Sequence, residues 1–467
     1  MKVIKHLGPL VILTCFLIQA CQPSEEELSS DNSLRLSYST DTVTFDTLFS
    51  RVGSITKRFK VYNPNDKAIN LDRVSLGGGD LSSYNITVNG SKGNRFTDEV
   101  IFGQDSLLVL VEVYINPEDQ DLPFLVKDSV IIEYNSRNEN IKLVSWGQDA
   151  IFINNQAIDC NTTWTNERPY VIYDSAWVNQ DCQLTVEAGA KIYIDNGAFL
   201  TIVGSLLIQG TADEKVEIRN IRLDPKFNKA PGQWQSLFFF PGSIGNSIDH
   251  TVIKNGTNGM ILAINLADGT GAEVNISNTS IQHMSESGIT AYAGTIRAQN
   301  LEIFNCQTQL LGCFAGGSYH FEHCTFSNEP NDFTRDGASV GFTNFLEFSD
   351  GATFVDDIVV RVNNSIIWGR EDEELAINFS ANASTDVKIE RNIIRSEDEA
   401  WVDLENLISQ EDNYPGFYSP NTYNYQIDSL SIARDKALLS TITHDLLGTI
   451  RDEKPDIGAY ERKDSIP

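Results

Sequence analysis

A four-residue signature recurs through the second half of the chain and limits the folds that the chain can adopt. Each copy has Asn or His, then two residues, then Ile or Phe. The copies are His250–Ile253, Asn278–Ile281, Asn300–Ile303, His323–Phe326 and Asn364–Ile367, and their final residues lie 28, 22, 23 and 41 positions apart. A period in the twenties with one short strand-like core per unit is typical of a solenoid, in which stacked turns bury a continuous core.

Segments on both sides of these copies resemble the right-handed parallel β-helix family. Leu184–Ile192, Leu200–Gly210 and Gly232–Trp234 are similar to the opening turns of such helices in bacterial surface proteins, and Asp445–Arg451 with Pro455–Glu461 is similar to their closing segment. The resemblance spans roughly residues 149 to 461. It implies an architecture and no particular reaction, because this fold carries both enzymes and inert adhesins.

The aligned Asn and His residues predict a structural ladder. Identical polar side chains in stacked turns can bond to the bends above and below and satisfy backbone groups at each corner. A zinc site made of His320, His323 and Cys324 is disfavoured, because neighbours along a strand point to opposite faces. No CxxC spacing occurs in the chain. We therefore expect no bound metal.

Residues 34–150 have a different sequence pattern, in which short segments of alternating apolar and polar residues are separated by turn sequences. Examples are Arg58–Tyr62, Tyr84–Val88 and Leu107–Ile115. This pattern indicates a β-sandwich of immunoglobulin type. The stretch from Phe59 to Gly90 resembles the immunoglobulin-like domains related to the ASPM, SPD-2 and hydin family, which implies a spacer or adaptor role. The expected fold class is all-β, with a sandwich at 34–150 and a right-handed parallel β-helix with a C-terminal closing segment at 151–467.

The N-terminus reads as a lipoprotein signal peptide at 1–20 and an acidic tether at 21–33. Lys2 and Lys5 precede an apolar run that ends at Ala20 and Cys21, and this run is too short to span a bilayer. Residues 17–21 resemble a bacterial lipobox, which implies that Cys21 is lipidated. The following QPSEEE resembles the export signal of Bacteroidota surface lipoproteins. The expected location is the outer membrane, lipid-anchored and exposed at the cell surface.

Charge and cysteine content narrow the possible partners. The chain has 35 Lys and Arg against 64 Asp and Glu, a net charge of −29, which argues against nucleic acid as a partner. An oxidising compartment favours disulfides, and Cys160 and Cys182 flank a segment similar to an entrance cap, so we expect them to be bonded. Cys306, Cys313 and Cys324 are an odd set, so at least one stays free. The sequence leaves the oligomeric state open.

Enzymatic signatures are incomplete. Pectin hydrolases of this fold use an Asn-Thr-Asp, Asp-Asp, Gly-His-Gly and Arg-Ile-Lys set, of which only the doublet Asp356 and Asp357, followed by Arg361, is present. The doublet also fits an exposed turn before the strand Ile358–Val362. Lyases of the fold need Ca²⁺-binding carboxylates, and no pattern singles out such a set. No cofactor is expected, and Ca²⁺ would enter only with a lyase.

The long interval from Phe326 to Ile367 suggests a binding site, because long ordered loops are often functional. It holds either an extra turn or a large loop. Phe333 and Arg335 lie in its irregular part, next to Pro330 and Gly337, and an aromatic ring with a guanidinium suits sugar recognition. Phe342, Phe345 and Phe348 fit equally well as interior residues of an added turn. We expect Phe333 and Arg335 to bind ligand without contributing to stability.

Asp-Ser or Asp-Thr followed by an aliphatic residue resembles the O-glycosylation sequon of Bacteroidota. Its candidate acceptors are Thr42, Thr47, Ser106, Ser129, Ser175, Ser429 and Ser465. The same dipeptides also begin turns and strands, which leaves a structural alternative open.

Together these features predict a non-catalytic, lipid-anchored cell-surface protein. Its β-helix would bind an extended polysaccharide or surface glycan, or serve as an adhesive or structural display. The alternative is a polysaccharide lyase or glycoside hydrolase of the parallel β-helix type.

Overall fold

The computed structural model describes residues 27–117, 124–330, 332–396, 407–409 and 414–463. Within these ranges the chain is built from strands, with short 3₁₀ turns such as Gly79–Leu81 and Pro225–Phe227. It divides into two compact units, residues 1–149 and 150–467. In the described ranges, no helix has the length and apolarity needed to cross a membrane. The predicted all-β class, a β-sandwich followed by a parallel β-helix, is confirmed.

The first unit is an immunoglobulin-like sandwich of two five-stranded sheets. One sheet has the order β1 (Ser37–Tyr38), β3 (Lys57–Tyr62), β10 (Ser106–Val113), β6 (Tyr84–Val88), β7 (Ser91–Gly93); the other has β2 (Thr42–Phe49), β12 (Arg137–Gln148), β11 (Phe124–Tyr134), β5 (Arg73–Leu76), β8 (Arg95–Phe96). A small pair, β4 (Ile69–Leu71) and β9 (Glu99–Ile101), completes it. Alternate residues of each strand face the core, so Phe59 and Val61 of β3 and Val109 and Val111 of β10 are fully buried.

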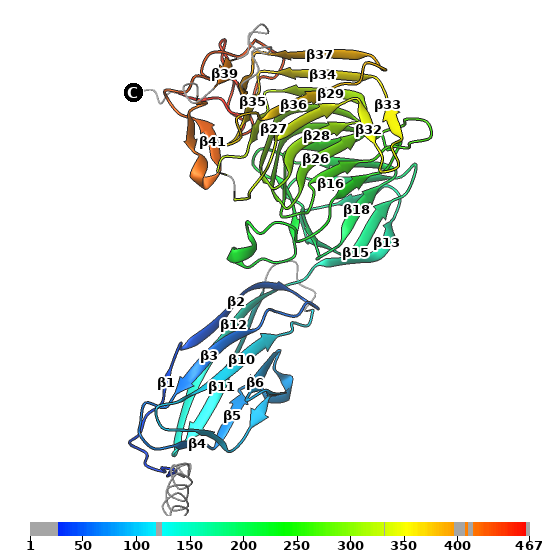
Figure 1. Ribbon diagram of the computed structural model, residues 1–467. Coiled ribbons are helices and arrows are strands. Elements are labelled where there is room, and N and C mark those ends of the chain that lie inside the picture. The colour runs from blue at the N-terminus through cyan, green and yellow to red at the C-terminus, as the bar shows by residue number, and fades with distance from the viewer. Residues whose placement is uncertain (1–26, 118–123, 331, 397–406, 410–413, 464–467) are drawn as a thin grey trace, which may run out of the picture. The chain divides into compact units, whose positions relative to one another are not determined.

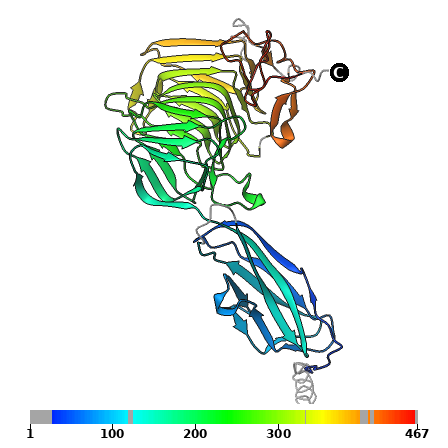
Figure 2. The ribbon, with the colours of Figure 1, turned by 180° about the vertical axis from the view of Figure 1, so that it is seen from behind.

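The second unit is a parallel sheet of 25 strands that winds through three faces in each turn. Face A comprises β14 (Thr162–Trp164), β16 (Gln183–Glu187), β19 (Ser205–Gln209), β22 (Asn246–Asp249), the first halves of β25 (Glu273–Met284) and β27 (Thr295–Cys306), β29 (Gly317–Glu322), β34 (Ile358–Asn363) and β37 (Thr385–Glu390). Figures 1 and 2 show the turns stacked as layers.

Faces B and C follow face A in each turn. Face B comprises the first halves of β13 (Ile151–Ile158) and β15 (Tyr170–Val178), β17 (Lys191–Ile194), β20 (Val216–Asn220), β23 (Thr251–Lys254), the second halves of β25 and β27, β30 (Thr325–Ser327), β35 (Ile366–Trp368), β38 (Ile393–Arg395) and β39 (Leu407–Ser409). Face C comprises the second halves of β13 and β15, β18 (Phe199–Ile202), β21 (Leu237–Phe239), β24 (Met260–Leu262), β26 (Ser287–Tyr292), β28 (Gln309–Phe314), β31 (Val340–Thr343) and β36 (Leu375–Asn378).

The last residue of each signature copy forms a stack inside the β-helix. Ile253, Ile281, Ile303, Phe326 and Ile367 are consecutive partners on face B, and each is 0% exposed. Burying one such side chain contributes about 1.5–3 kcal/mol. The repeated apolar position therefore holds successive turns in register.

The first residue of each copy makes the corner between faces A and B. His250, Asn278, Asn300, His323 and Asn364 all have left-handed backbones, with φ of 44°, 48°, 48°, 51° and 51°, a conformation in which Asn and His are enriched. The Asn300 amide donates to Asn278 Oδ1 at 2.9 Å, and the Asn364 amide lies 3.2 Å from His323 Nε2. The predicted structural ladder is confirmed.

A second ladder, not predicted, makes the corner between faces B and C. Asn255, His283 and Asn305 have φ of 71°, 57° and 53°. The Asn305 amide lies 2.7 Å from His283 Nδ1, and this ring nitrogen can accept the bond only when the imidazole is neutral. Burial, with the nearby Lys229, lowers the pKa of His283 to about 4.

Three other expectations can be compared with the structure. The predicted disulfide between Cys160 and Cys182 is present, and Cys306, Cys313 and Cys324 are all free and buried. β30 pairs directly with β35, so the long interval holds loops and no extra turn. Its described insertions are residues 328–330 with 332–339 and the hairpin of β32 (Phe345–Glu347) and β33 (Thr353–Val355). Phe342 is interior, whereas Phe345 belongs to the hairpin.

Residues 414–463, here called the C-terminal strap, lie along the outside of face B. The strap includes β40 (Phe417–Ser419) and β41 (Asn424–Ile427). Its His444 carbonyl accepts from Asn300, and its Leu438 amide donates to Asn364 Oδ1. The segment predicted to close the β-helix thus runs beside several turns, as the orange and red ribbon shows (Figure 1).

The second ladder predicts acid sensitivity. The unfolded chain protonates His283 near its ordinary pKa of 6.5, whereas the folded corner resists a proton until about pH 4, so folding stability falls as the pH drops through this window. The variant His283→Asn keeps at this corner a residue that tolerates the left-handed backbone and carries an amide. Between pH 7 and pH 5, we expect its free energy of unfolding to fall by about 2 kcal/mol less than that of the parent.

Urea unfolding at both pH values measures this difference. The parent and the variant share all other titrating groups, including the buried His323. Equal losses of stability in the two proteins would contradict the assignment to His283.

Candidate functional site

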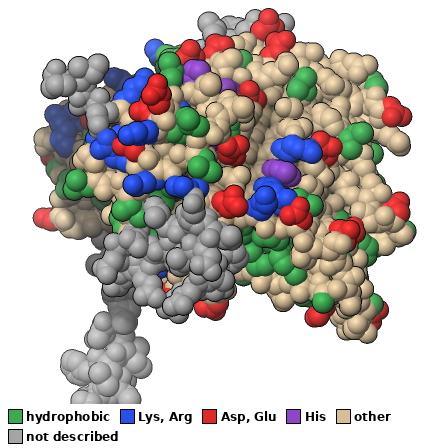
Figure 3. Space-filling view, turned by 90° about the horizontal axis from the view of Figure 1, so that it is seen from above, with side chains coloured by type: hydrophobic (Ala, Val, Ile, Leu, Met, Phe, Trp, Pro, Cys, Tyr) green, Lys and Arg blue, Asp and Glu red, His purple; other side chains and the backbone are tan. Residues whose placement is uncertain are grey.

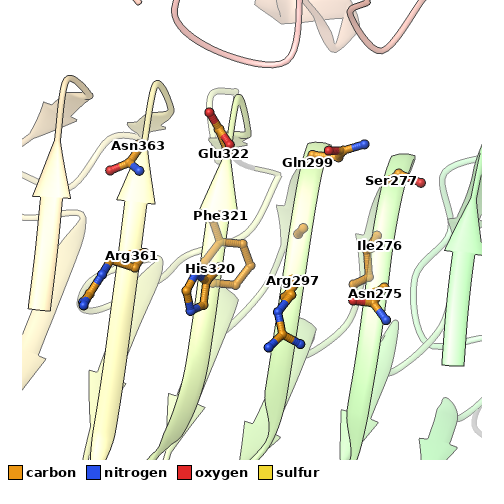
Figure 4. A pocket seen from close by; sticks show the side chains of 11 residues that line it. Asn275, Ile276, Ser277, Arg297, Gln299, His320, Phe321, Glu322, Arg361 and Asn363 are labelled. Carbon is orange, nitrogen blue, oxygen red and sulfur yellow. The ribbon is translucent and has the colours of Figure 1, made fainter. Parts of the chain in front are cut away.

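Face A presents a hollow of about 400 Å³ on its outer side, lined by residues of β25, β27, β29 and β34. Its lining alternates with the core along each strand: Ile276, Ala298, Phe321 and Val362 point inward and are buried, so their neighbours point outward. Figure 4 shows these outward side chains rising from adjacent strands.

The outward side chains form two rows because the strands are in register. The basic row consists of Arg297, His320, Arg361 and Lys388, on consecutive strands β27, β29, β34 and β37. The polar row consists of Ser277, Gln299, Glu322 and Asn363. Since neighbouring strands lie about 4.8 Å apart, Arg297 and Arg361 are separated at the backbone by roughly 10 Å, with His320 between them.

Carboxylates hold the two arginines to different degrees. Arg361 donates to the Val360 carbonyl at 2.9 Å, to the Asp386 carbonyl at 2.8 Å and to the Asp386 carboxylate. Its side chain is 22% exposed, and its hydrogen bond lowers the pKa of Asp386. Arg297 pairs with Glu273 at 3.3 Å and is 56% exposed. Arg361 is therefore fixed, whereas Arg297 remains largely solvated.

The surroundings of His320 disfavour the charged form of its imidazole ring. Partial burial, followed by the positive charges of Arg297 and Arg361, lowers its pKa. At neutral pH the ring is uncharged and can accept or donate a hydrogen bond. Seen from above, the molecule shows a histidine between basic groups with carboxylates beside them (Figure 3).

This arrangement suits anion recognition. Arginine presents forked donors that match carboxylates and sulfates. Ser277, Gln299 and Asn363 of the polar row add neutral donors and acceptors. Hydrolysis of a glycosidic bond usually needs two carboxyl groups, whereas Glu322 is the one acidic residue that lines the hollow. The described ranges contain no cluster of three or more His, Cys, Asp or Glu able to hold a metal ion.

The three predicted catalytic candidates, Asp356, Asp357 and Arg361, do not lie together at one site in the structure. Arg361 lines the hollow. Asp356 and Asp357 lie in the connection before β34, where Asp357 accepts from the Ser384 amide at 2.7 Å and Asp356 accepts from the Asp357 amide at 2.8 Å. They therefore cap a turn, as the structural alternative expected.

Arg297 and Glu322 were not predicted from the sequence, and His320 was considered only as a disfavoured zinc ligand. A signal was available, because the position three residues before each signature copy reads Ser247, Asn275, Arg297, His320 and Arg361. Aligning the copies would have shown polar residues changing to basic ones along one outward row.

The prediction that Arg335 binds ligand at the surface is wrong. Its side chain is 1% exposed and donates to both oxygens of the fully buried Glu374, at 2.6 and 2.8 Å. The same carboxylate accepts the amides of Ser339 and Glu371. This pair ties the inserted loop to the connection between β35 and β36. Phe333 is half-buried nearby.

We expect Arg335→Ala to lower the free energy of unfolding by about 3–5 kcal/mol, because the buried Glu374 carboxylate would lose its ion-pair partner. Chemical unfolding measures the loss. Replacing both partners together, Arg335→Leu with Glu374→Leu, should recover much of it. A single variant as stable as the parent would contradict the structural role.

The remaining predicted sites do not converge on the hollow. Thr42, Thr47, Ser106, Ser129 and Ser175 are half-buried in or beside strands, and Ser429 is exposed. Ser465 and the lipidation candidate Cys21 lie outside the described residues.

Comparisons with known proteins leave the family open. No family model matches the chain, and no curated protein matches it. Solved structures with partial similarity include a family 123 glycoside hydrolase from Clostridium perfringens, at 9% identity, 27% coverage of this chain, 30% of that chain and a TM-score of 0.19. The ASH/PapD-like domain 7 of human CEP192 matches at 9% identity over 28% of this chain and 94% of its own, with a TM-score of 0.17. Similarities this low carry no argument about activity.

Proposed function

We propose that this chain is a lipid-anchored cell-surface protein whose β-helix binds an extended acidic glycan along face A. The observation that supports the proposal is the basic row, which places two cations, Arg297 and Arg361, in a hollow of a chain with a net charge of −29. The negative charge spread over the rest of the surface repels anions in general. An anion is therefore expected to bind only where its negative groups match the local row of cations.

The basic row suits a ligand whose negative groups repeat along its length. Arg297 and Arg361 lie on strands that are next-but-one neighbours, so successive acidic groups of one chain can meet both guanidiniums. Gln299, Glu322 and Asn363 lie beside them and can bond sugar hydroxyls. A polar hollow that extends across several turns fits a linear polymer better than a small molecule.

One observation favours the second candidate, a lyase. Elimination next to a uronate carboxylate requires a cation to neutralise that carboxylate and a base to take the proton. Neutral His320 between two arginines provides both types of group. The single lining carboxylate gives no comparable support to a hydrolase.

Replacing Arg297 and Arg361 together with Gln should weaken binding of polygalacturonate at least tenfold, since hydrogen bonds to charged groups contribute about 1.5–3 kcal/mol each. Calorimetric titration at two salt concentrations measures the effect, and neutral dextran tests selectivity. The matched control removes equal charge from the sandwich with Arg58→Gln and Lys60→Gln.

Unchanged affinity in the face A variant would place the site elsewhere. Preference for dextran would contradict acid recognition. Unsaturated sugar ends appearing in the same incubations, and disappearing with His320→Asn, would favour the lyase.

The anchor is tested separately. Cys21→Ala should leave a folded protein that no longer sediments with the outer membrane. Stable attachment needs several acyl chains, and the variant would lack the cysteine that carries them. Cys15→Ala, within the expected signal peptide, is the control. Membrane association of the Cys21 variant equal to that of the control would contradict lipidation.

A further inference from the structure

The C-terminal strap covers polar and apolar side chains that the strands of face B point outward. Beneath it lie Glu302, Thr325 and Ile366 in one row and Phe304 and Trp368 in the next. Backbone groups of the strap bond directly to this surface. The Ala459 amide donates to Thr325 Oγ1 at 3.0 Å, and the Gly458 amide donates to the Asn364 carbonyl at 2.8 Å.

Glu302 is the acidic group at the centre of this contact. It is 4% exposed, and its carboxyl oxygens lie 2.6 Å from Tyr460 Oη of the strap and 3.0 Å from Ser280 Oγ of β25. Within the described part of the chain it forms no ion pair. The other titratable groups that act on it are Tyr425 of β41 and Lys215 of the turn before β20, and Asp445 acts on Tyr460.

We propose that Glu302 is a proton-controlled latch: the strap holds face B most tightly when Glu302 is protonated, and its hold loosens when this carboxyl ionises. A buried carboxylate without a counter-ion is costly, and two hydroxyl partners offset only part of that cost. A protonated carboxyl is compatible with the same contacts. Loosening would uncover Phe304, Ile366 and Trp368.

The direction of the effect follows from linkage. Burial raises the pKa of Glu302 from 4.5 to about 7 when the strap is docked, against the opposing effect of its hydrogen bonds. The released state binds its proton only below the ordinary value. Docking is therefore strongest below about pH 4.5 and is progressively lost as the pH rises through 7.

Two other carboxyl groups also contribute to the pH dependence of strap docking in the parent protein. Burial also raises the pKa values of Asp456 and Glu461 inside the strap, and these changes have the same sign. A pH series on the parent alone would not identify the group responsible. Glu302→Gln isolates it, because Gln resembles the protonated side chain and does not titrate.

The test measures hydrogen exchange by mass spectrometry on the full exported chain and on its Glu302→Gln variant at equal pH. Peptides that cover residues 440–463 report on the strap. At pH 5 the two proteins should show similar protection. At pH 8.5 the strap of the variant should be protected up to about 100-fold more than that of the parent.

Two controls keep the test decisive. Glu273→Gln, on face A, should behave as the parent at both pH values. Tyr460→Phe should reduce strap protection at both pH values and keep the dependence on pH, since Glu302 remains buried against Ser280 without the tyrosine bond. Equal protection of the parent and the Glu302 variant at pH 8.5 would overturn the proposal. The result does not depend on glycan binding.

Discussion

In-register parallel stacking is the constraint on which the β-helix depends. Each strand bonds to its counterpart one turn away, and a slip of one residue would expose every inward Ile or Phe. The corners must adopt a left-handed backbone that costs most residues about 1–2 kcal/mol. Asn and His at these corners tolerate that backbone, and Asn300 and Asn305 also bond to the corner below. The corner ladders therefore fix the register, and the register decides which outward side chains become neighbours.

The basic row and the contact of the strap with face B are both products of that register. Arg297, His320 and Arg361 are separated by 23 and 41 residues in sequence but lie on adjacent strands. Insertions at the corners, such as the β32–β33 hairpin, leave this alignment intact. On face B the same alignment gathers Ser280, Glu302 and Thr325 beneath the strap. Face A therefore keeps an open hollow, whereas face B is covered by the strap.

The repeated features of the structure could be predicted from the sequence, whereas contacts between residues far apart in the chain could not. The period, the alternation and the signature were sufficient for the fold class, the first ladder and the structural role of Asp356 and Asp357. The basic row could have been found by aligning the copies. Arg335 was assigned wrongly because its partner, Glu374, lies 39 residues away in another corner. The contact of Glu302 with Tyr460 spans 158 residues, and no local pattern indicates it.

Binding of an acidic glycan on face A is tested most directly by a structure of the protein with trigalacturonate. We predict that the sugar lies across β27, β29 and β34, with a carboxylate within hydrogen-bonding distance of Arg297 or Arg361. A trisaccharide bound on face C, on the strap or on the sandwich, with the basic row still paired to Glu273 and Asp386, would contradict the account.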